Sequence, residues 1–220
     1  DDALRGESRF NADGTLDILV WARPQFDGPA LRAMALLQRV DDVSGNAHER
    51  ELLGGDLDYL ARVSREPCFD LWEERFGHHY HTRLVALTAL KRGEAWRLSR
   101  NELMSARAYA RAANQLAGLL DTHWSAAEGH YLAAAKARGA SPRDLDAAVI
   151  LAIVQGRLSS GRHSPLDPRA QATLSKLEDH FAKSFEINRN RAPGLGVLFG
   201  RFPGDGYYGG GAFPFTSCAA

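Results

Sequence analysis

Three carboxylates and one tryptophan fall within five residues, in the run Asp70-Leu71-Trp72-Glu73-Glu74. Burying a carboxylic acid beside an indole disfavours its charged form and raises its pKa. An acid that is still protonated near neutral pH can donate a proton to a leaving oxygen. The flat apolar face of an indole suits the C–H face of a sugar ring. The run therefore predicts one wall of a site that hydrolyses glycosides.

The same residues are also typical of the start of an ordinary α-helix. Asp70 would then be the N-cap, and Glu73 would answer it at the third helical position. Short motifs have a high false-positive rate, so this stretch alone leaves both interpretations open.

Composition narrows the class of protein. The 220 residues contain 27 Lys and Arg against 27 Asp and Glu, so nothing in the net charge favours a nucleic acid or an anionic membrane surface as partner. No apolar run reaches the roughly 18 residues of a membrane span. Cys68 and Cys218 are too few for a disulfide scaffold. The chain begins with Asp1 and shows no signal peptide, so we expect a trimmed, mature or fragmentary chain.

Apolar periodicity predicts an all-α fold. The six expected helices lie at about 29–40, 49–65, 79–91, 101–120, 141–155 and 169–188. Short extended pieces are expected only around 16–20 and 131–133. No linker divides the chain, so we expect a single domain over 1–220, with long loops at the helix ends that carry function.

Two further stretches could bind something. The glycine-rich run at 200–211 contains Arg201 and two tyrosines, so a ligand could approach its backbone closely, although it could also be a flexible turn. His78, His79 and His81 could ligate a metal, but no third ligand at helical spacing is evident. A solvated helix start is the preferred interpretation of the histidines.

Several segments together resemble the glucoamylases, which are family 15 glycoside hydrolases. The matching segments, in family order, are GESRFNADGT at 6–15, WARPQFDGPALR at 21–32, DLDYL at 56–60, FDLWEERFG at 69–77, RDLD at 143–146 and GRFPGDGY at 200–207. Gly204 departs from the family pattern, which has an acidic residue there.

The resemblance implies part of an (α/α)6 toroid that removes glucose, with inversion, from the non-reducing ends of starch-like α-1,4-glucans. By position, Glu73 would be the general acid and Asp70 a supporting carboxylate. The residues that would contact the substrate are Trp21, Arg23, Leu71 (through its backbone), Trp72, Glu74 and Arg201. The resemblance implies no cofactor and no metal, an α-glucan or maltooligosaccharide as partner, no nucleic acid or membrane, and a secreted or periplasmic location.

An inverting enzyme needs an acid and a base roughly 6.5–9.5 Å apart on opposite faces of the sugar. Asp70 and Glu74 lie on the same short connection as Glu73, so neither readily supplies the opposite face. In the family the base comes from a later segment, so we expect this chain to be about the middle half of a toroid. Such a piece would expose apolar helix faces and tend to self-associate. Two alternatives stay open: a non-catalytic saccharide-binding or regulatory module on the same scaffold, and a trehalase-like or dextran-acting relative.

Overall fold

The computed structural model describes residues 2–7, 9–17, 22–40, 46–135, 141–192 and 194–206. The chain divides into two compact units, unit 1 (Asp1–Leu120) and unit 2 (Asp121–Ala220). Helices dominate the described residues of both units, and the strands found there form two short antiparallel pairs. The prediction of a mostly helical chain is therefore confirmed.

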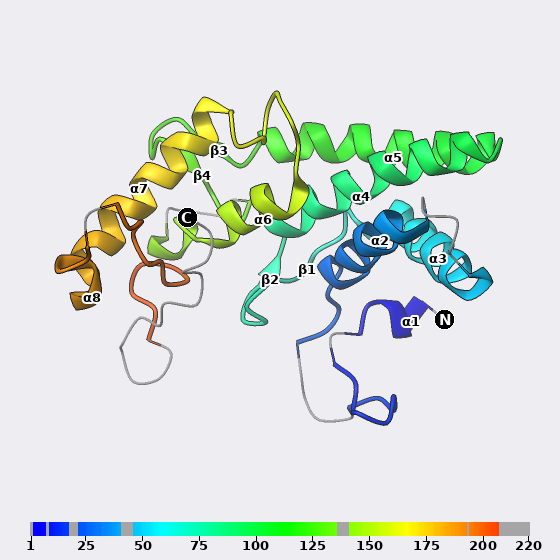
Figure 1. The fold of residues 1–220 in the computed structure, drawn as a ribbon, viewed down its shortest axis with the longest axis horizontal. Helices are drawn as coiled ribbons and strands as arrows, with labels where there is room; N and C mark the ends of the chain where they lie inside the picture. The colour runs from blue at the N-terminus through cyan, green and yellow to red at the C-terminus, as the bar shows by residue number, and fades with distance from the viewer. Residues whose placement is uncertain are drawn as a thin grey trace. The chain divides into compact units, whose positions relative to one another are not determined.

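The helices of unit 1 run from blue to green in Figure 1 and are α1 (Asp2–Arg5), α2 (Asp27–Val40), α3 (Ala47–Val63), α4 (Tyr80–Ser99) and α5 (Leu103–Asp121). Helix α2 packs against both α3 and α4. Its contact face is made of small and apolar side chains such as Ala33 and Met34, and α3 contributes Leu53 and Leu57, all of them buried. The helices predicted at 29–40, 49–65, 79–91 and 101–120 are present, with shifted ends.

Helix α4 continues well beyond its predicted end at residue 91, as far as Ser99. A glycine inside a helix usually costs about 0.5–1 kcal/mol. Gly93, however, lies so close to α3 that a Cβ atom there would sit 2.7 Å from both terminal methyl carbons of Leu57. Trp96, one turn further on, is buried as well. Tertiary packing therefore carries the helix through a position that propensity alone would weaken.

The carboxylate run does not start a helix. Strand β1 (Cys68–Phe69) pairs antiparallel with β2 (Phe76–Gly77), in the register that sets Phe69 opposite Phe76. The rings of these two residues meet edge to face, with centroids 5.4 Å apart. The helix-start interpretation of Asp70 and Glu73 is therefore wrong, because the chain reverses between them as a hairpin.

One carboxylate joins three helices of unit 1. Asp56 of α3 is fully buried and accepts hydrogen bonds from Arg5 of α1 and Arg32 of α2, with both shortest N–O distances at 2.7 Å. The negative charge of Asp56 is thereby neutralised by two arginines, as a buried charge requires. Gly55 leaves room for this arrangement, because a Cβ atom there would lie only 2.1 Å from the Arg5 guanidinium.

The elements of unit 2 are β3 (Trp124–Ser125), β4 (His130–Tyr131), the 3-10 turn η1 (Pro142–Asp144), α6 (Ala148–Gly156), α7 (Pro168–Ser184) and α8 (Glu186–Arg189). Strands β3 and β4 form a hairpin that packs on α7. The backbone N–H of Tyr131 donates to Thr173 Oγ1 on α7 at 2.9 Å. The extended piece predicted at 131–133 is thus present at Tyr131.

The helix predicted over 141–155 is interrupted. Ser141 and Asp144 form a capping box around a single 3-10 turn, and Leu145 then adopts extended angles (φ −87°, ψ 99°). The α-helix begins only at Ala148, whose N–H donates to Asp146 Oδ1 at 2.8 Å. The sixth predicted helix is divided in the same way, because Phe185 is extended (φ −105°, ψ 130°) between α7 and α8.

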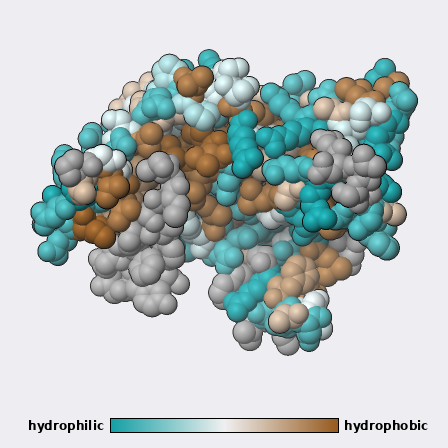
Figure 2. All heavy atoms as spheres, viewed as in Figure 1, coloured by the Kyte–Doolittle hydropathy of each residue, from teal (hydrophilic) through white to brown (hydrophobic). Residues whose placement is uncertain are grey.

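Large apolar side chains are exposed in both units. In unit 1 they include Leu103 and Met104 at the start of α5, and in unit 2 they include Val154 and Ile187. Figure 2 shows apolar surface over α6 and α7 on the face in view. Within the described residues, no helix is both long enough and apolar enough to cross a membrane.

Candidate active site

The predicted acid Glu73 lies in the loop of the β1–β2 hairpin. The Asp70 N–H donates to the carbonyl of Arg75 at 2.9 Å, which closes the hairpin, and the Glu73 N–H donates to the carbonyl of Asp70 at 2.9 Å. Residues 71–74 are thus confined to a tight turn. This turn carries four of the predicted site residues: Leu71, Trp72, Glu73 and Glu74.

Asp70 holds the turn together from inside. Its side chain is buried, and its Oδ1 atom accepts the backbone N–H groups of Glu74 at 2.8 Å and Arg75 at 3.1 Å. A carboxylate that accepts backbone N–H groups in this way makes charge-assisted hydrogen bonds. Asp70 is therefore a structural support for the loop that carries Glu73.

Glu73 has a left-handed backbone conformation with φ 62°. A residue with a Cβ atom is held in this region at a cost of order 1–3 kcal/mol, and such residues concentrate at functional sites. The side chains of Trp72 and Glu73 are half-buried, and that of Glu74 is exposed. The turn therefore presents an acid beside an indole at a partly desolvated surface.

A neighbouring segment fixes the hairpin in unit 1. The Phe69 N–H donates to the carbonyl of Pro24 at 2.9 Å, and Gln25 Nε2 donates to the carbonyl of Asp70 at 3.2 Å. The Gln25 N–H in turn donates to the carbonyl of Gly6 at 3.0 Å. Three segments that are distant in the sequence therefore meet at the base of the hairpin.

Arg23 lies on the segment that holds the hairpin. Its Nε atom donates to both carboxylate oxygens of Glu7 at 2.7 Å, and Nη2 donates to the carbonyl of Asp17. These bonds orient the guanidinium of Arg23, whose side chain as a whole is about one third exposed. Trp21, the other predicted contact on this segment, lies outside the described residues.

The histidines after the hairpin are not a solvated helix start. His79 and His81 are buried, His79 Nε2 lies 3.1 Å from the carbonyl of Cys68, and His81 Nδ1 lies 3.5 Å from Asp27. Burial lowers the pKa of His79, while the nearby charge of Asp70 opposes that shift. Burial also raises the pKa of the Cys68 thiol to about 12. No group of three or more His, Cys, Asp or Glu among the described residues could hold a metal ion.

Arg201 belongs to unit 2 and is buried there. Its guanidinium makes a two-pronged ion pair with Asp205, with N–O distances of 2.7 and 2.6 Å. Its backbone carbonyl accepts the N–H of Ala147 at 2.8 Å. The guanidinium carbon of Arg201 lies over the Phe202 ring, 5.0 Å from its centroid. The guanidinium carbon of Arg143 lies 4.1 Å from the same centroid. The rest of the glycine-rich stretch, from residue 207 onward, lies outside the described residues.

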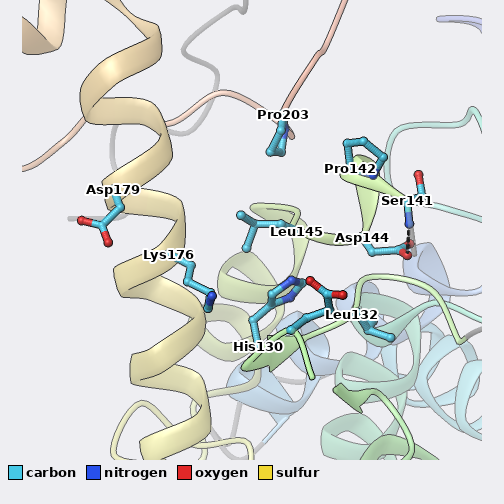
Figure 3. A pocket seen from close by; sticks show the side chains of 10 residues that line it. His130, Leu132, Ser141, Pro142, Asp144, Leu145, Lys176, Asp179 and Pro203 are labelled. Carbon is cyan, nitrogen blue, oxygen red and sulfur yellow. Dashed lines mark hydrogen bonds between the residues drawn. The ribbon is translucent and has the colours of Figure 1, made fainter. Parts of the chain in front are cut away.

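A cavity of about 560 Å³ opens beside this loop (Figure 3). Pro203 lines it from the arginine loop, Leu145 from the segment before α6, and His130 from β4. Lys176 extends into it from α7 (Figure 3). The Nδ1 atom of His130 lies 2.9 Å from the carbonyl of Tyr131. Because a carbonyl can only accept, Nδ1 of His130 carries a proton.

Three residues of this arrangement were not predicted as site residues. Glu7 and Gln25 lie inside the matched segments. In the folded chain Glu7 accepts hydrogen bonds from Arg23, and Gln25 donates one to the hairpin. Asp205 lies within the matched segment at 200–207, but that segment is a loop, so no helical spacing pointed to its pair with Arg201.

Comparison with solved structures defines the class. A glucoamylase of Saccharomycopsis fibuligera matches with a TM-score of 0.82 and 25% identity over 96% of this chain and 48% of its own. The family 15 glucoamylase of Hypocrea jecorina matches with a TM-score of 0.82 and 26% identity over 96% of this chain and 37% of its own. Family 15 glucoamylases have an (α/α)6 fold, so the predicted fold class is confirmed.

The profile described as Glycosyl hydrolases family 15 matches residues 3–220. The chain belongs to glycosyl hydrolases family 15, and the resemblance seen in its motifs is confirmed. Among named relatives, Glucoamylase 1 of Rhizopus oryzae is 31% identical over 94% of this chain and 36% of its own length. The probable glucoamylase of Schizosaccharomyces pombe is 31% identical over 93% of this chain and 44% of its own. The chain thus spans less than half the length of these relatives.

Proposed function

We propose that this chain contributes the acid side of an exo-acting glycoside hydrolase that releases glucose, with inversion, from the non-reducing ends of α-1,4-glucans. The observation that carries the proposal is the hairpin, in which Asp70 supports a strained turn that presents Glu73 beside Trp72. Membership of family 15 supports the substrate class, since the relatives above are named glucoamylases.

In this proposal Glu73 is the general acid and protonates the oxygen of the bond that breaks. A rigid turn suits this role, because proton transfer requires the donor within hydrogen-bond reach of the leaving oxygen. Trp72 offers its ring to the apolar face of a glucose unit. Glu74, the Leu71 backbone, Arg23 and Trp21 contact sugar hydroxyls and rings around it.

Arg201, which lies in unit 2, is proposed as a substrate-binding residue because of its match to the family motif. A guanidinium is a rigid fork of donors that can bind two hydroxyl oxygens at once. Asp205 fixes that fork with two short bonds, so Arg201 is oriented before any sugar arrives. Preorganisation of this kind lowers the entropic cost of binding.

We assign the general base to no residue of this chain. Inversion requires a second carboxylate roughly 6.5–9.5 Å from the acid, with room for a water. Asp70 accepts two backbone N–H groups of the hairpin that carries Glu73, and Glu74 is the next residue along the same turn. Both therefore suit supporting and binding roles better than that of a base on the opposite face.

The direct test is the release of glucose from maltose and maltoheptaose, measured for the chain and for Glu73→Gln. Glu66→Gln, an exposed carboxylate before the hairpin, is the matched control. Activity that Glu73→Gln abolishes and Glu66→Gln preserves supports the acid role. Activity that survives Glu73→Gln contradicts it.

Binding of maltoheptaose without turnover would favour the alternative of a saccharide-binding module. Hydrolysis of trehalose or dextran in preference to maltoheptaose would favour the other family activities. We further propose that residues 1–220 act as one incomplete catalytic domain of a secreted or periplasmic protein. We also propose that the exposed apolar side chains promote self-association, which sedimentation at several concentrations would detect.

A further inference from the structure

A groove of about 470 Å³ lies in unit 1, lined by one face of α3 with the turn that follows it and by one face of α5. Its lining residues recur every three or four positions along each helix, as residues on one helical face do. Three of them are alanines: Ala61 on α3, and Ala108 and Ala112 on α5. Because methyl groups occupy so little volume, the two helices leave open space between them.

A buried contact ties the two walls together. Tyr109 of α5 is fully buried and donates its hydroxyl to Asp58 Oδ1 of α3 at 2.7 Å. Arg97 supports this contact, with its Nε atom 3.2 Å from the Tyr109 hydroxyl. Burial, together with the hydrogen bond to Asp58, raises the pKa of Tyr109 well above its usual range, so the hydroxyl keeps its proton. The width of the groove is therefore set by fixed groups.

The groove carries a surplus of positive charge. Three arginines line it, Arg62, Arg65 and Arg111, against the single carboxylate of Asp58. That carboxylate already accepts the Tyr109 hydroxyl and lies 3.9 Å from Arg97. Within the described part of the chain, neither Arg65 nor Arg111 has an ion pair. Like charges gathered in a groove raise the local concentration of anions.

Helix electrostatics account for only part of this cluster. Arg62 lies in the last turn of α3, where cations interact favourably with the helix dipole, and Arg65 lies just beyond the C-cap Ser64. Arg111 lies in the middle of α5, which runs from Leu103 to Asp121, where the dipole offers it nothing. Arg111 nevertheless lines the same groove as the other two arginines.

We propose that this groove binds an oxyanion of the phosphate or sulfate type, held by Arg65, Arg111 and Arg62. Guanidinium groups match the oxygens of phosphate and sulfate with paired N–H donors. A volume of about 470 Å³ falls in the usual range of small-molecule sites, so it can hold the group on a small organic carrier as well as the free ion. None of the lining residues belongs to the hairpin that carries Glu73.

The test is the shift of the thermal unfolding midpoint on titration with three probes: inorganic phosphate, inorganic sulfate and glucose 6-phosphate. Sodium chloride at equal ionic strength and neutral glucose are the blanks. A ligand that binds the folded state alone raises the midpoint in proportion to the logarithm of its concentration. Tighter binding of glucose 6-phosphate than of inorganic phosphate identifies a carried group, and the reverse identifies the free ion.

The variants are Arg65→Gln, Arg111→Gln and the double change, with Arg107→Gln as the matched control. Arg107 is exposed on the same helix but does not line the groove. We expect each single change to weaken phosphate binding about tenfold, as loss of one charge-assisted contact does, and the control to leave it unchanged. All these side chains are exposed, so the variants should fold.

Three outcomes overturn the proposal. The first is an equal shift with chloride, and the second is an undiminished phosphate response in the double variant. The third is binding of a long polyanion such as heparin together with no response to any of the three probes. That result would indicate a diffuse basic surface in place of a defined site. None of these readouts depends on glucose release, so they are independent of the proposed hydrolysis.

Discussion

The carboxylate of Asp70 and the backbone N–H of Glu74 are joined at 2.8 Å across the hairpin turn. This bond and a second from the N–H of Arg75 span the residue proposed as the acid, because Asp70 precedes Glu73 and both donors follow it. The stability of the turn and the position of Glu73 should therefore depend on the same buried oxygen.

Replacing Asp70 should separate positioning from charge. Asp70→Ala leaves two backbone N–H groups without their acceptor, which should cost about 1–3 kcal/mol of unfolding free energy. Asp70→Asn keeps an oxygen acceptor of the same shape and should cost less. We expect kcat for maltoheptaose to follow the same order, with KM little changed.

Urea unfolding and steady-state glucose release on both variants provide the check. If Asp70→Asn lost as much activity as Asp70→Ala while remaining nearly as stable as the wild type, the charge itself would matter. Asp70 would then take part in the chemistry rather than in positioning.

The left-handed conformation of Glu73 predicts opposite effects on stability and activity. Glu73→Gly removes the steric strain at φ 62° and should stabilise the fold by about 1 kcal/mol, after allowance for the greater freedom of glycine in the unfolded chain. The same change should abolish glucose release. Glu74→Gly, one residue later and without a positive φ, should destabilise the fold, and urea midpoints of the two variants give the comparison.

The buried pair of Arg201 and Asp205 should be costly to break on one side. Asp205→Ala leaves the guanidinium without its main carboxylate partner and should cost about 3–5 kcal/mol. The double change of Arg201→Met with Asp205→Leu should cost clearly less, since no charge is left buried. A double-mutant cycle by urea unfolding measures the difference, and additive losses would contradict the coupling. Substrate affinity should fall wherever Arg201 is missing.

A buried histidine in unit 2 should make stability depend on pH. His163 packs its ring on Tyr131, with centroids 5.2 Å apart, and its Nε2 lies 3.5 Å from Asp121. Arg162 pairs with the same Asp121. Burial lowers the pKa of His163, and the charges of Asp121 and Asp167 oppose this only in part.

The sign follows from proton binding. Well above pH 6.5 the histidine is neutral in both the folded and the unfolded state and has no effect on stability. Below that, the unfolded chain binds the proton first, so the free energy of unfolding falls until the pH passes the lower folded-state pKa. His163→Asn tolerates the left-handed backbone (φ 63°) and should flatten the decline below about pH 6.5. The check is the free energy of unfolding in urea at several pH values, and a pH dependence left unchanged by His163→Asn would contradict this assignment. Some pH dependence should remain in the variant, because burial also lowers the pKa values of His78, His79 and His180.

The helices were predictable because their apolar periodicity is strong, but their ends were not. The sequence around Gly93 did not indicate that α4 continues past this residue to the buried Trp96. The continuation depends on the close contact of Gly93 with Leu57 of α3. The break at Leu145 was likewise hidden, because a good cap at Ser141 predicts a helix start whether or not the helix continues.

The residues of the candidate site could be named from the sequence, but their geometry could not. The local pattern around Glu73 fits a helix cap and a hairpin equally well, and pairing of Phe69 with Phe76 decides between them. The roles of Gln25 and Glu7 depend on contacts across 45 and 16 positions of the chain. Such contacts leave no periodic signal in a single sequence.

The shared carboxylate of Asp56 has a consequence for the N-terminal turn. If the ion pair between Arg5 and Asp56 breaks, Arg32 still pairs with Asp56. Detaching α1 therefore does not leave the buried carboxylate of Asp56 without a cation. Separation of α1 should therefore need far less free energy than global unfolding, as local openings generally do. Amide hydrogens of α1 should exchange with deuterated solvent orders of magnitude faster than those of α4, and this turn would be the first part of unit 1 that a protease could reach.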